Sequence, residues 1–228
     1  MHKILALFSG AICLCSASIV VTAVPSAQKP QSFAQWCLQR ESVPTATRHT
    51  IDVLLEEAGT NDCQQADTKL RNLTTLNLAA NNIVDLKPLM GLSNLTTLNL
   101  NINNIVDLKP LAGLSNLTTL DLSHNNIIDV KPLAGLSSLT TLNLAGSGDV
   151  ITLDLTGNKI IDVKGNNIID VKPLARLSNL TTLDLTGNKI VDVKPLAGLS
   201  NLIVLSLKKN QLTVKVCPVK PESICSFF

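Results

Sequence analysis

The chain repeats itself every 22 residues, and this period constrains its fold more than any other feature. The unit Leu95–Asn116, LTTLNLNINNIVDLKPLAGLSN, has near-copies before and after it. One such unit cannot bury its own apolar face, so neighbouring units must stack on each other. The leucine that opens the unit recurs at Leu73, Leu95, Leu117, Leu139, Leu180 and Leu202.

Each unit contains the pattern of a short strand followed by a turn and a short helix. Leu98 and Leu100 alternate with polar residues, which is typical of a half-buried strand. Asn103 stands where the chain turns away from this strand. Asp107 then precedes Lys-Pro-Leu, and an Asp cap with Pro in the first turn favours a short 3₁₀ helix, which Gly113 ends.

These positions together resemble the leucine-rich repeat, in the 22-residue type found in the internalins of bacterial surface and secreted proteins. The resemblance covers roughly residues 70–212. It implies an α/β fold, a right-handed solenoid with short parallel strands on a concave face. It also implies 3₁₀ turns and loops on the convex face, and a helical N-terminal cap. Seven strand segments are expected, one of them at Val150–Leu155, and they would span roughly 29 Å at the usual spacing of parallel strands.

The resemblance also assigns a role to the asparagine of each turn. In the family, this side chain forms hydrogen bonds with backbone groups of its own coil and of the adjacent one. A buried turn needs such partners for its N–H and C=O groups. The expected ladder is Asn81, Asn103, Asn125, Asn158, Asn188 and Asn210.

The unit that opens at Leu139 departs from the pattern. Ser147 stands where the asparagine belongs, and a new strand pattern opens at Val150, only 11 residues after Leu139. Residues 158–164 are then echoed by residues 166–172. We therefore predict a local defect over residues 145–173, left by recombination; a purposeful binding loop is the alternative.

The two ends of the chain differ in composition from the repeats. Met1–Ala23 has Lys3, a long apolar run and a small-residue end, which predicts a secretory signal peptide; an uncleaved membrane anchor is the alternative. Residues 24–32 form a polar linker, residues 33–69 a helical N-terminal cap and residues 213–228 a C-terminal cap. In the C-terminal cap, Phe227 and Phe228 are expected to cover the last coil.

Four cysteines follow the predicted signal peptide. An even number in an exported chain indicates disulfides, with free buried thiols as the alternative. Two cysteines precede the repeats and two follow them, and a disulfide tolerates a Cα separation of only about 6 Å. The predicted pairs are Cys37–Cys63 and Cys217–Cys225. The segments that carry them also resemble the flanks of exported cyanobacterial leucine-rich repeat proteins.

No constellation of residues typical of catalysis is present in the sequence. His49 and His124 lack the spacing of metal ligands. The recurring Asp before Lys-Pro-Leu is explained by helix capping, and the Asn-Leu-Thr triplets recur because the unit does. We expect no enzyme, no cofactor and no metal. The formal net charge of +2 argues against nucleic acid as a partner.

In the family, ligands usually meet the concave strand face. That face is polar here and carries no Trp, Tyr or Arg, so a wet contact with a protein or surface glycan is expected, without stable membrane insertion. The secreted, periplasmic or cell-surface chain would bind through Thr97, Asn99, Asn101, Thr119, Asp121, Ser123, Thr141, Asn143, Asp154 and Asp184. The alternative is a structural or decaying repeat without a dedicated ligand.

Overall fold

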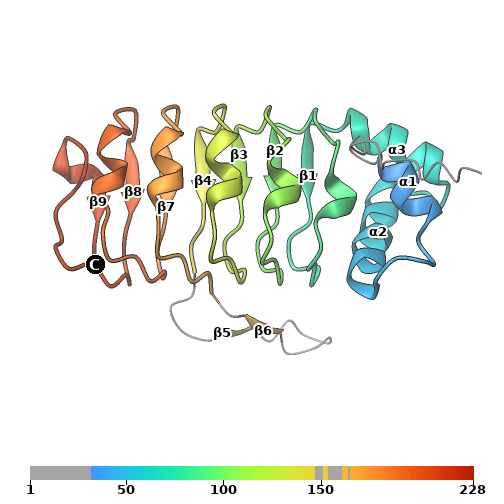
Figure 1. The fold of residues 1–228 in the computed structure, drawn as a ribbon, viewed down its shortest axis with the longest axis horizontal. Coiled ribbons are helices and arrows are strands. Elements are labelled where there is room, and N and C mark those ends of the chain that lie inside the picture. Colours follow the sequence, from blue (N-terminus) through green and yellow to red (C-terminus); the bar gives the residue numbers. More distant parts are fainter. Residues whose placement is uncertain (1–31, 147–150, 154–160, 164) are drawn as a thin grey trace, which may run out of the picture.

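The computed structural model describes residues 32–146, 151–153, 161–163 and 165–228. In this part of the chain, helices form one end and a row of parallel strands with 3₁₀ turns forms the rest (Figure 1). The strands are stacked along the long axis of the molecule, as the 22-residue period predicts. The fold is therefore a leucine-rich repeat solenoid.

The helical end consists of α1 (Phe33–Leu38), α2 (Thr45–Ala58) and α3 (Cys63–Asn72). Helix α2 ends at Gly59, whose left-handed backbone (φ 61°) favours glycine. The sequence analysis predicted helical structure for residues 33–69 but did not delimit α3, because its mostly polar sequence shows little apolar periodicity. Its N-terminus is stabilised by Asp62, which accepts hydrogen bonds from the backbone N–H groups of Gln64 and Gln65.

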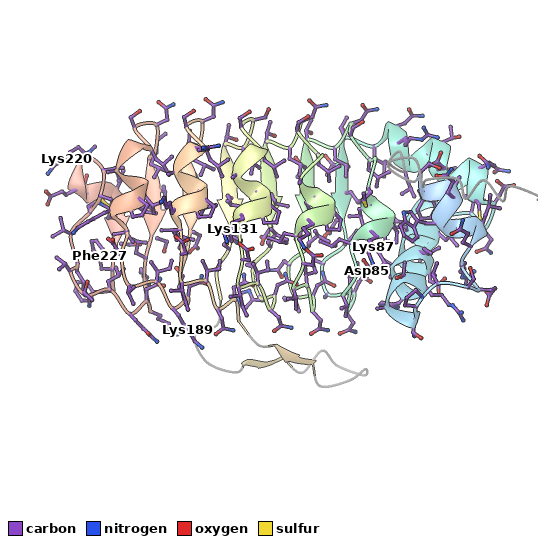
Figure 2. All side chains as sticks on the ribbon, viewed as in Figure 1. Asp85, Lys87, Lys131, Lys189, Lys220 and Phe227 are labelled. Atoms are coloured by element: carbon purple, nitrogen blue, oxygen red, sulfur yellow. A yellow bond between two sulfur atoms is a disulfide. The ribbon has the colours of Figure 1, made fainter. Side chains whose placement is uncertain are left out.

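Hydrogen bonds attach the helices to the first coil. The hydroxyl of Thr47 donates to the Asp85 carboxylate at 2.6 Å, and the hydroxyl of Thr50 donates to the Asp85 carbonyl at 2.7 Å. Asp85 and Lys87 lie at the helical end of the solenoid in Figure 2. The cap thus covers the first coil with satisfied polar groups as well as with its own apolar residues.

The main sheet has seven parallel strands within the described residues, in the order β1-β2-β3-β4-β7-β8-β9. Matching positions of successive units pair with each other, for example Leu98 with Leu120. These central leucines are almost completely buried, and leucine, isoleucine and valine fill the core along the solenoid. The strands are β1 (Thr75–Asn77), β2 (Thr97–Asn99), β3 (Thr119–Asp121), β4 (Thr141–Asn143), β7 (Thr182–Asp184), β8 (Val204–Ser206) and β9 (Cys225–Ser226).

Short 3₁₀ helices return the chain from one strand to the next, as predicted. In five coils the Asp before Lys-Pro-Leu accepts a hydrogen bond from the lysine N–H, at 2.8–3.0 Å. The N-cap residue itself is the following Leu or Val, so the aspartates stabilise the first turn from one residue before the predicted cap position. The 3₁₀ helices are η1 (Lys87–Leu89), η2 (Lys109–Leu111), η3 (Lys131–Gly135), η4 (Lys172–Arg176), η5 (Lys194–Gly198) and η6 (Glu222–Ile224).

The fourth coil, which opens at Leu139, lacks the main-sheet strand that was expected at Val150–Leu155. Strand β4 pairs directly with β7, so the segment around Val150 adds no strand to the main sheet. Instead β5 (Ile151–Leu153) pairs with β6 (Ile161–Val163) in a separate antiparallel pair, which lies below the row of strands in Figure 1. The seventh strand of the main sheet is β9.

The predicted defect over residues 145–173 is too wide. Gly146 donates a backbone hydrogen bond to Thr186 at 2.7 Å, and Asn166 is buried in the turn position. Residues 139–146 followed directly by residues 166–179 make a regular 22-residue unit, LTTLNLAGNNIIDVKPLARLSN. The fourth coil is thus complete, and residues 147–165 are a 19-residue insertion within it.

Both ends of the solenoid carry a disulfide. Cys37 is joined to Cys63 and Cys217 to Cys225, with Cα separations of 5.6 and 5.7 Å. At the C-terminal end Phe227 packs against the core, but Phe228 is 87% exposed. The expectation that both rings cover the last coil is therefore wrong for Phe228. Among the described residues, no helix has the length and apolar character needed to cross a membrane.

Candidate functional site

The outward side chains of strands β1–β4, β7 and β8 and of the residues just after them form one surface, here called the strand face. Because the strands pair in register, equivalent side chains lie in columns about 4.8 Å apart. The first column is Thr75, Thr97, Thr119, Thr141, Thr182 and Val204. The second column is Asn77, Asn99, Asp121, Asn143, Asp184 and Ser206. The third column is Ala79, Asn101, Ser123, Ala145, Thr186 and Lys208.

The amide and carboxylate side chains of the second column are held in place by the backbone. In each, Oδ1 accepts a hydrogen bond from the N–H two residues later, at 2.8–3.2 Å. This local bond fixes the side-chain orientation, so little conformational entropy remains to be lost on binding. The outer atom of each group, Nδ2 or Oδ2, remains directed away from that bond.

A hydrogen-bond network occupies the centre of the strand face. Asp121 accepts a hydrogen bond from the Ser123 hydroxyl and another from Asn143 Nδ2, the latter at 3.2 Å. Asn101 Nδ2 in turn donates to the Ser123 hydroxyl. Ser123 is consequently 1% exposed. The expectation that Ser123 contacts a ligand is therefore wrong, because its neighbours cover it.

The threonines of the first column are the available hydrogen-bonding groups of the strand face. Within the described part of the chain, the hydroxyls of Thr75, Thr97, Thr119, Thr141 and Thr182 form no intramolecular hydrogen bond, and their side chains are half-buried or exposed. A β-branched side chain has few rotamers, so each hydroxyl has a restricted position. This column is a regular array of donors and acceptors at the spacing of the strands.

Charge is sparse on the strand face. Asp121 and Asp184 are its acidic residues, one on each side of Asn143, and Lys208 lies at the C-terminal end. Neither aspartate has a salt-bridge partner within the described residues. Asp154, predicted to belong to this surface, lies outside the described residues, as does Asn158 of the predicted ladder.

The turn asparagines form the ladder that the resemblance implies, with one substitution. Asn103, Asn125, Asn188 and Asn210 donate to carbonyls of their own and the preceding coil and accept from a backbone N–H of that coil. Asn166 makes the same bonds between Asn125 and Asn188, in the place that was assigned to Asn158. The first residue, Asn81, donates only to Ala79 within its own coil.

A second asparagine ladder was missed by the sequence analysis. Asn94 donates from Nδ2 to a carbonyl of helix α3, and Asn116, Asn179 and Asn201 each donate to a carbonyl of the preceding coil, at 2.8–2.9 Å. The threonine two residues after the first three also donates backwards, as Thr96 does to Thr74. The recurring Asn-Leu-Thr triplet is therefore a structural element: its asparagine and threonine connect neighbouring coils while its leucine fills the core. The 22-residue spacing of the asparagine was the signal for it.

The ionisable residues of the described chain form no arrangement suited to metal binding: no group of three or more His, Cys, Asp or Glu side chains could hold an ion there. His49 Nε2 lies 2.6 Å from the carbonyl oxygen of Asn81, at the junction of the cap with the first coil. His124 lies in the third turn, in a left-handed conformation (φ 54°). The two histidines thus lie on different elements.

Family models place the chain in a known class. Leucine-rich repeat models match residues 71–127, 115–165 (as two copies) and 176–193. With the strand, turn and 3₁₀ geometry described above, the chain belongs to the leucine-rich repeat proteins. No protein of curated function matches it in sequence. Leucine-rich repeat domains are in general non-catalytic scaffolds that bind proteins.

Within that class the chain is internalin-like. It is similar to an internalin (inlF) of Listeria monocytogenes, with 26% identity over 79% of this chain and a TM-score of 0.53. It spans 54% of that internalin. Internalin C2 of the same organism is 28% identical over 78% of this chain and 91% of its own length, with a TM-score of 0.50. A leucine-rich repeat protein of Leptospira interrogans is 26% identical over 72% of this chain and 38% of its own length, with a TM-score of 0.52.

Proposed function

We propose that this protein is an exported, non-catalytic module that binds a protein or a surface glycan through its strand face. The observation that carries the proposal is the column of threonine hydroxyls that form no hydrogen bond to the described part of the chain, beside a column of amides and carboxylates fixed by the backbone. A rigid array of unused hydrogen-bonding groups is prepared for a polar ligand at low entropic cost.

The composition of the strand face defines the kind of contact that it supports. Tight protein interfaces centre on Trp, Tyr and Arg, and none of these residues lies in the three columns. The partner is therefore polar, and many individually weak or water-mediated hydrogen bonds supply the affinity. Thr97, Asn99, Asn101, Thr119, Asp121, Thr141, Asn143 and Asp184 form the centre of the proposed site.

Two features support export. The disulfides Cys37–Cys63 and Cys217–Cys225 fit a protein that folds in an oxidising compartment outside the cytoplasm. Met1–Ala23 has the sequence pattern of a signal peptide. The mature protein would then begin at Val24 and act in the periplasm, at the cell surface or in the medium.

A structural repeat without a ligand is the second candidate, and the uniformity of the columns favours it. Thr-Leu-Asn or Thr-Leu-Asp recurs in five strands, as recent duplication of a unit would produce without selection for binding. The two candidates make opposite predictions for substitutions on the strand face.

The deciding experiment compares two triple variants of residues 24–228. Thr97→Val, Thr119→Val and Thr141→Val remove three free hydroxyls with little change of shape. The matched control, Val84→Thr, Val106→Thr and Ile128→Thr, changes three exposed residues that lie just after the turns. A partner captured from the source organism's envelope or medium, or on a glycan array, should bind the first variant roughly 10- to 100-fold more weakly, at about 0.5–1 kcal/mol for each of the three lost hydrogen bonds. Equal loss in both variants, or in neither, contradicts the proposed site.

A further inference from the structure

The charge of the molecule is concentrated at the end opposite the helices. Counting side chains, residues 185–228 carry six lysines against two acidic residues, Asp192 and Glu222. The rest of the chain carries 13 basic and 15 acidic residues. One end of the solenoid is therefore strongly basic although the net charge of the whole chain is only +2.

Three exposed lysines of this end are not neutralised by neighbours. Lys208, Lys209 and Lys215 are exposed and form no salt bridge within the described residues. Lys220 pairs with Glu222, and its hydrogen bond lowers the pKa of that carboxyl, which stays ionised. In the first coil, by contrast, Lys87 forms a salt bridge, with its Nζ 3.5 Å from Oδ2 of Asp85.

Apolar side chains are exposed among these lysines. Val214 is 63% exposed, Val216 59% and Phe228 87%. The ammonium group of Lys215 lies 4.2 Å from the centre of the Phe228 ring. Val214 and Val216 also line a hollow of about 450 Å³ between the last coils and the C-terminal cap, together with Asp192 and Lys194. Figure 2 shows Lys220 and Phe227 at this end, away from the helices.

We propose that this basic tip, defined as Lys208, Lys209, Lys215, Val214, Val216 and Phe228, docks on a bilayer surface that contains anionic lipid. Lysines close to an acidic bilayer each strengthen binding about five-fold, and flanking apolar side chains enter the interfacial region. The positive charge of the tip is complementary to the negative charge of the lipid headgroups.

The residue types favour lipid over an acidic protein as the partner. All six basic residues of 185–228 are lysines, and the segment contains no Arg, Trp or Tyr. Protein interfaces are enriched in those three types and depleted in lysine, whereas a fluid headgroup layer makes no demand for the planar geometry of arginine. Docking through the tip would hold the helices away from the bilayer and leave the strand face accessible from the side.

The test measures binding of residues 24–228 to vesicles by co-sedimentation. The chain begins at Val24 because the apolar segment before it would itself enter lipid. Vesicles of equal parts phosphatidylglycerol and phosphatidylcholine should bind the protein, and vesicles of phosphatidylcholine alone should not. About 1 M salt, at which the screening length is about 3 Å, should release it.

Matched variants localise the effect. Lys208→Gln, Lys209→Gln and Lys215→Gln together should weaken binding roughly 100-fold, at about five-fold per lysine. Lys87→Gln, Lys109→Gln and Lys131→Gln remove the same charge from the regular coils and should leave binding nearly unchanged. Phe228→Ser should weaken binding roughly 10-fold through lost apolar burial. Circular dichroism checks that each variant is folded.

Three outcomes overturn the inference. The first is no binding to the anionic vesicles in low salt. The second is an equal effect of the two lysine variants. The third is complete displacement of the protein from vesicles by soluble polyglutamate together with no effect of Phe228→Ser, which would identify an acidic polymer as the partner. None of these outcomes bears on the proposed centre of the strand face, which does not include Lys208, so the two proposals fail separately.

Discussion

The regular coil of residues 95–116 and the interrupted coil of residues 139–179 differ in length by 19 residues but share the strand register and the buried turn asparagine. Strands β2 and β4 pair with their neighbours in the same register. Asn103 lies in the turn of the regular coil and Asn166 in the turn of the interrupted one, and both make equivalent buried hydrogen bonds. The comparison shows that a coil is defined by its buried positions and tolerates an insertion between them.

The site of the insertion explains why it is tolerated. It lies between Gly146 and Asn166, after the last strand contact and before the turn asparagine. A Cβ atom on Gly146 would lie 2.9 Å from Asn166 N, so the two ends of the insertion meet within the coil. The chain leaves and re-enters at one point, and no buried group of the coil is displaced.

The largest expected effect distinguishes Asn166 from Asn158. Asn166→Ala removes a buried side chain that is 2% exposed and leaves carbonyls of Leu122 and Leu144 and the N–H of Ile127 without this partner. We expect the free energy of unfolding, measured by urea denaturation, to fall by about 3–4 kcal/mol.

Asn158→Ala serves as the control, since Asn158 follows the same Thr-Gly sequence as the ladder residue Asn188. The assignment of the turn position to Asn166 predicts a change near zero for this variant. A large loss with Asn158→Ala and none with Asn166→Ala would show that the insertion supplies the ladder residue and would reverse the comparison.

The second effect concerns the close approach at Gly146. A Cβ atom there would lie 2.5 Å from the carbonyl oxygen of Gly187 and 2.8 Å from that of Asn166. Backbone atoms cannot move aside as a flexible side chain can. Gly146→Val should therefore lower the free energy of unfolding by about 2–3 kcal/mol.

Gly113 of the regular coil serves as the control glycine, because a Cβ atom there has no neighbour within 4 Å. Gly113→Val should change the stability by about 0.5 kcal/mol or less. If both variants lose the same amount in parallel urea titrations, crowding at the insertion site is not the cause.

Most of the fold could be predicted from the sequence, but less of the candidate site could. The 22-residue period predicted the solenoid, the strand positions of the regular coils and the asparagine turn, because each recurs with the same buried neighbours. It failed at the interruption, since residues 158–164 and 166–172 are nearly identical and only tertiary packing selects Asn166. The burial of Ser123 and the unused hydroxyls of the first column depend on contacts between coils, which periodicity alone does not reveal.

Apart from the control variants, the smallest change in stability is expected for a variant that lacks the insertion. Deleting residues 147–165 joins Gly146 to Asn166 and restores a 22-residue unit. Closing a flexible loop of this length costs at most about 2–3 kcal/mol, and the β5–β6 pairing offsets part of this cost. The deletion should therefore leave the circular dichroism spectrum of the solenoid intact and raise the free energy of unfolding by about 1–2 kcal/mol. A deletion variant that fails to fold would show that the insertion supplies contacts on which the fourth coil depends. If instead the variant folds but loses a partner captured by the full chain, the insertion is part of the binding surface and the recombination explanation is wrong.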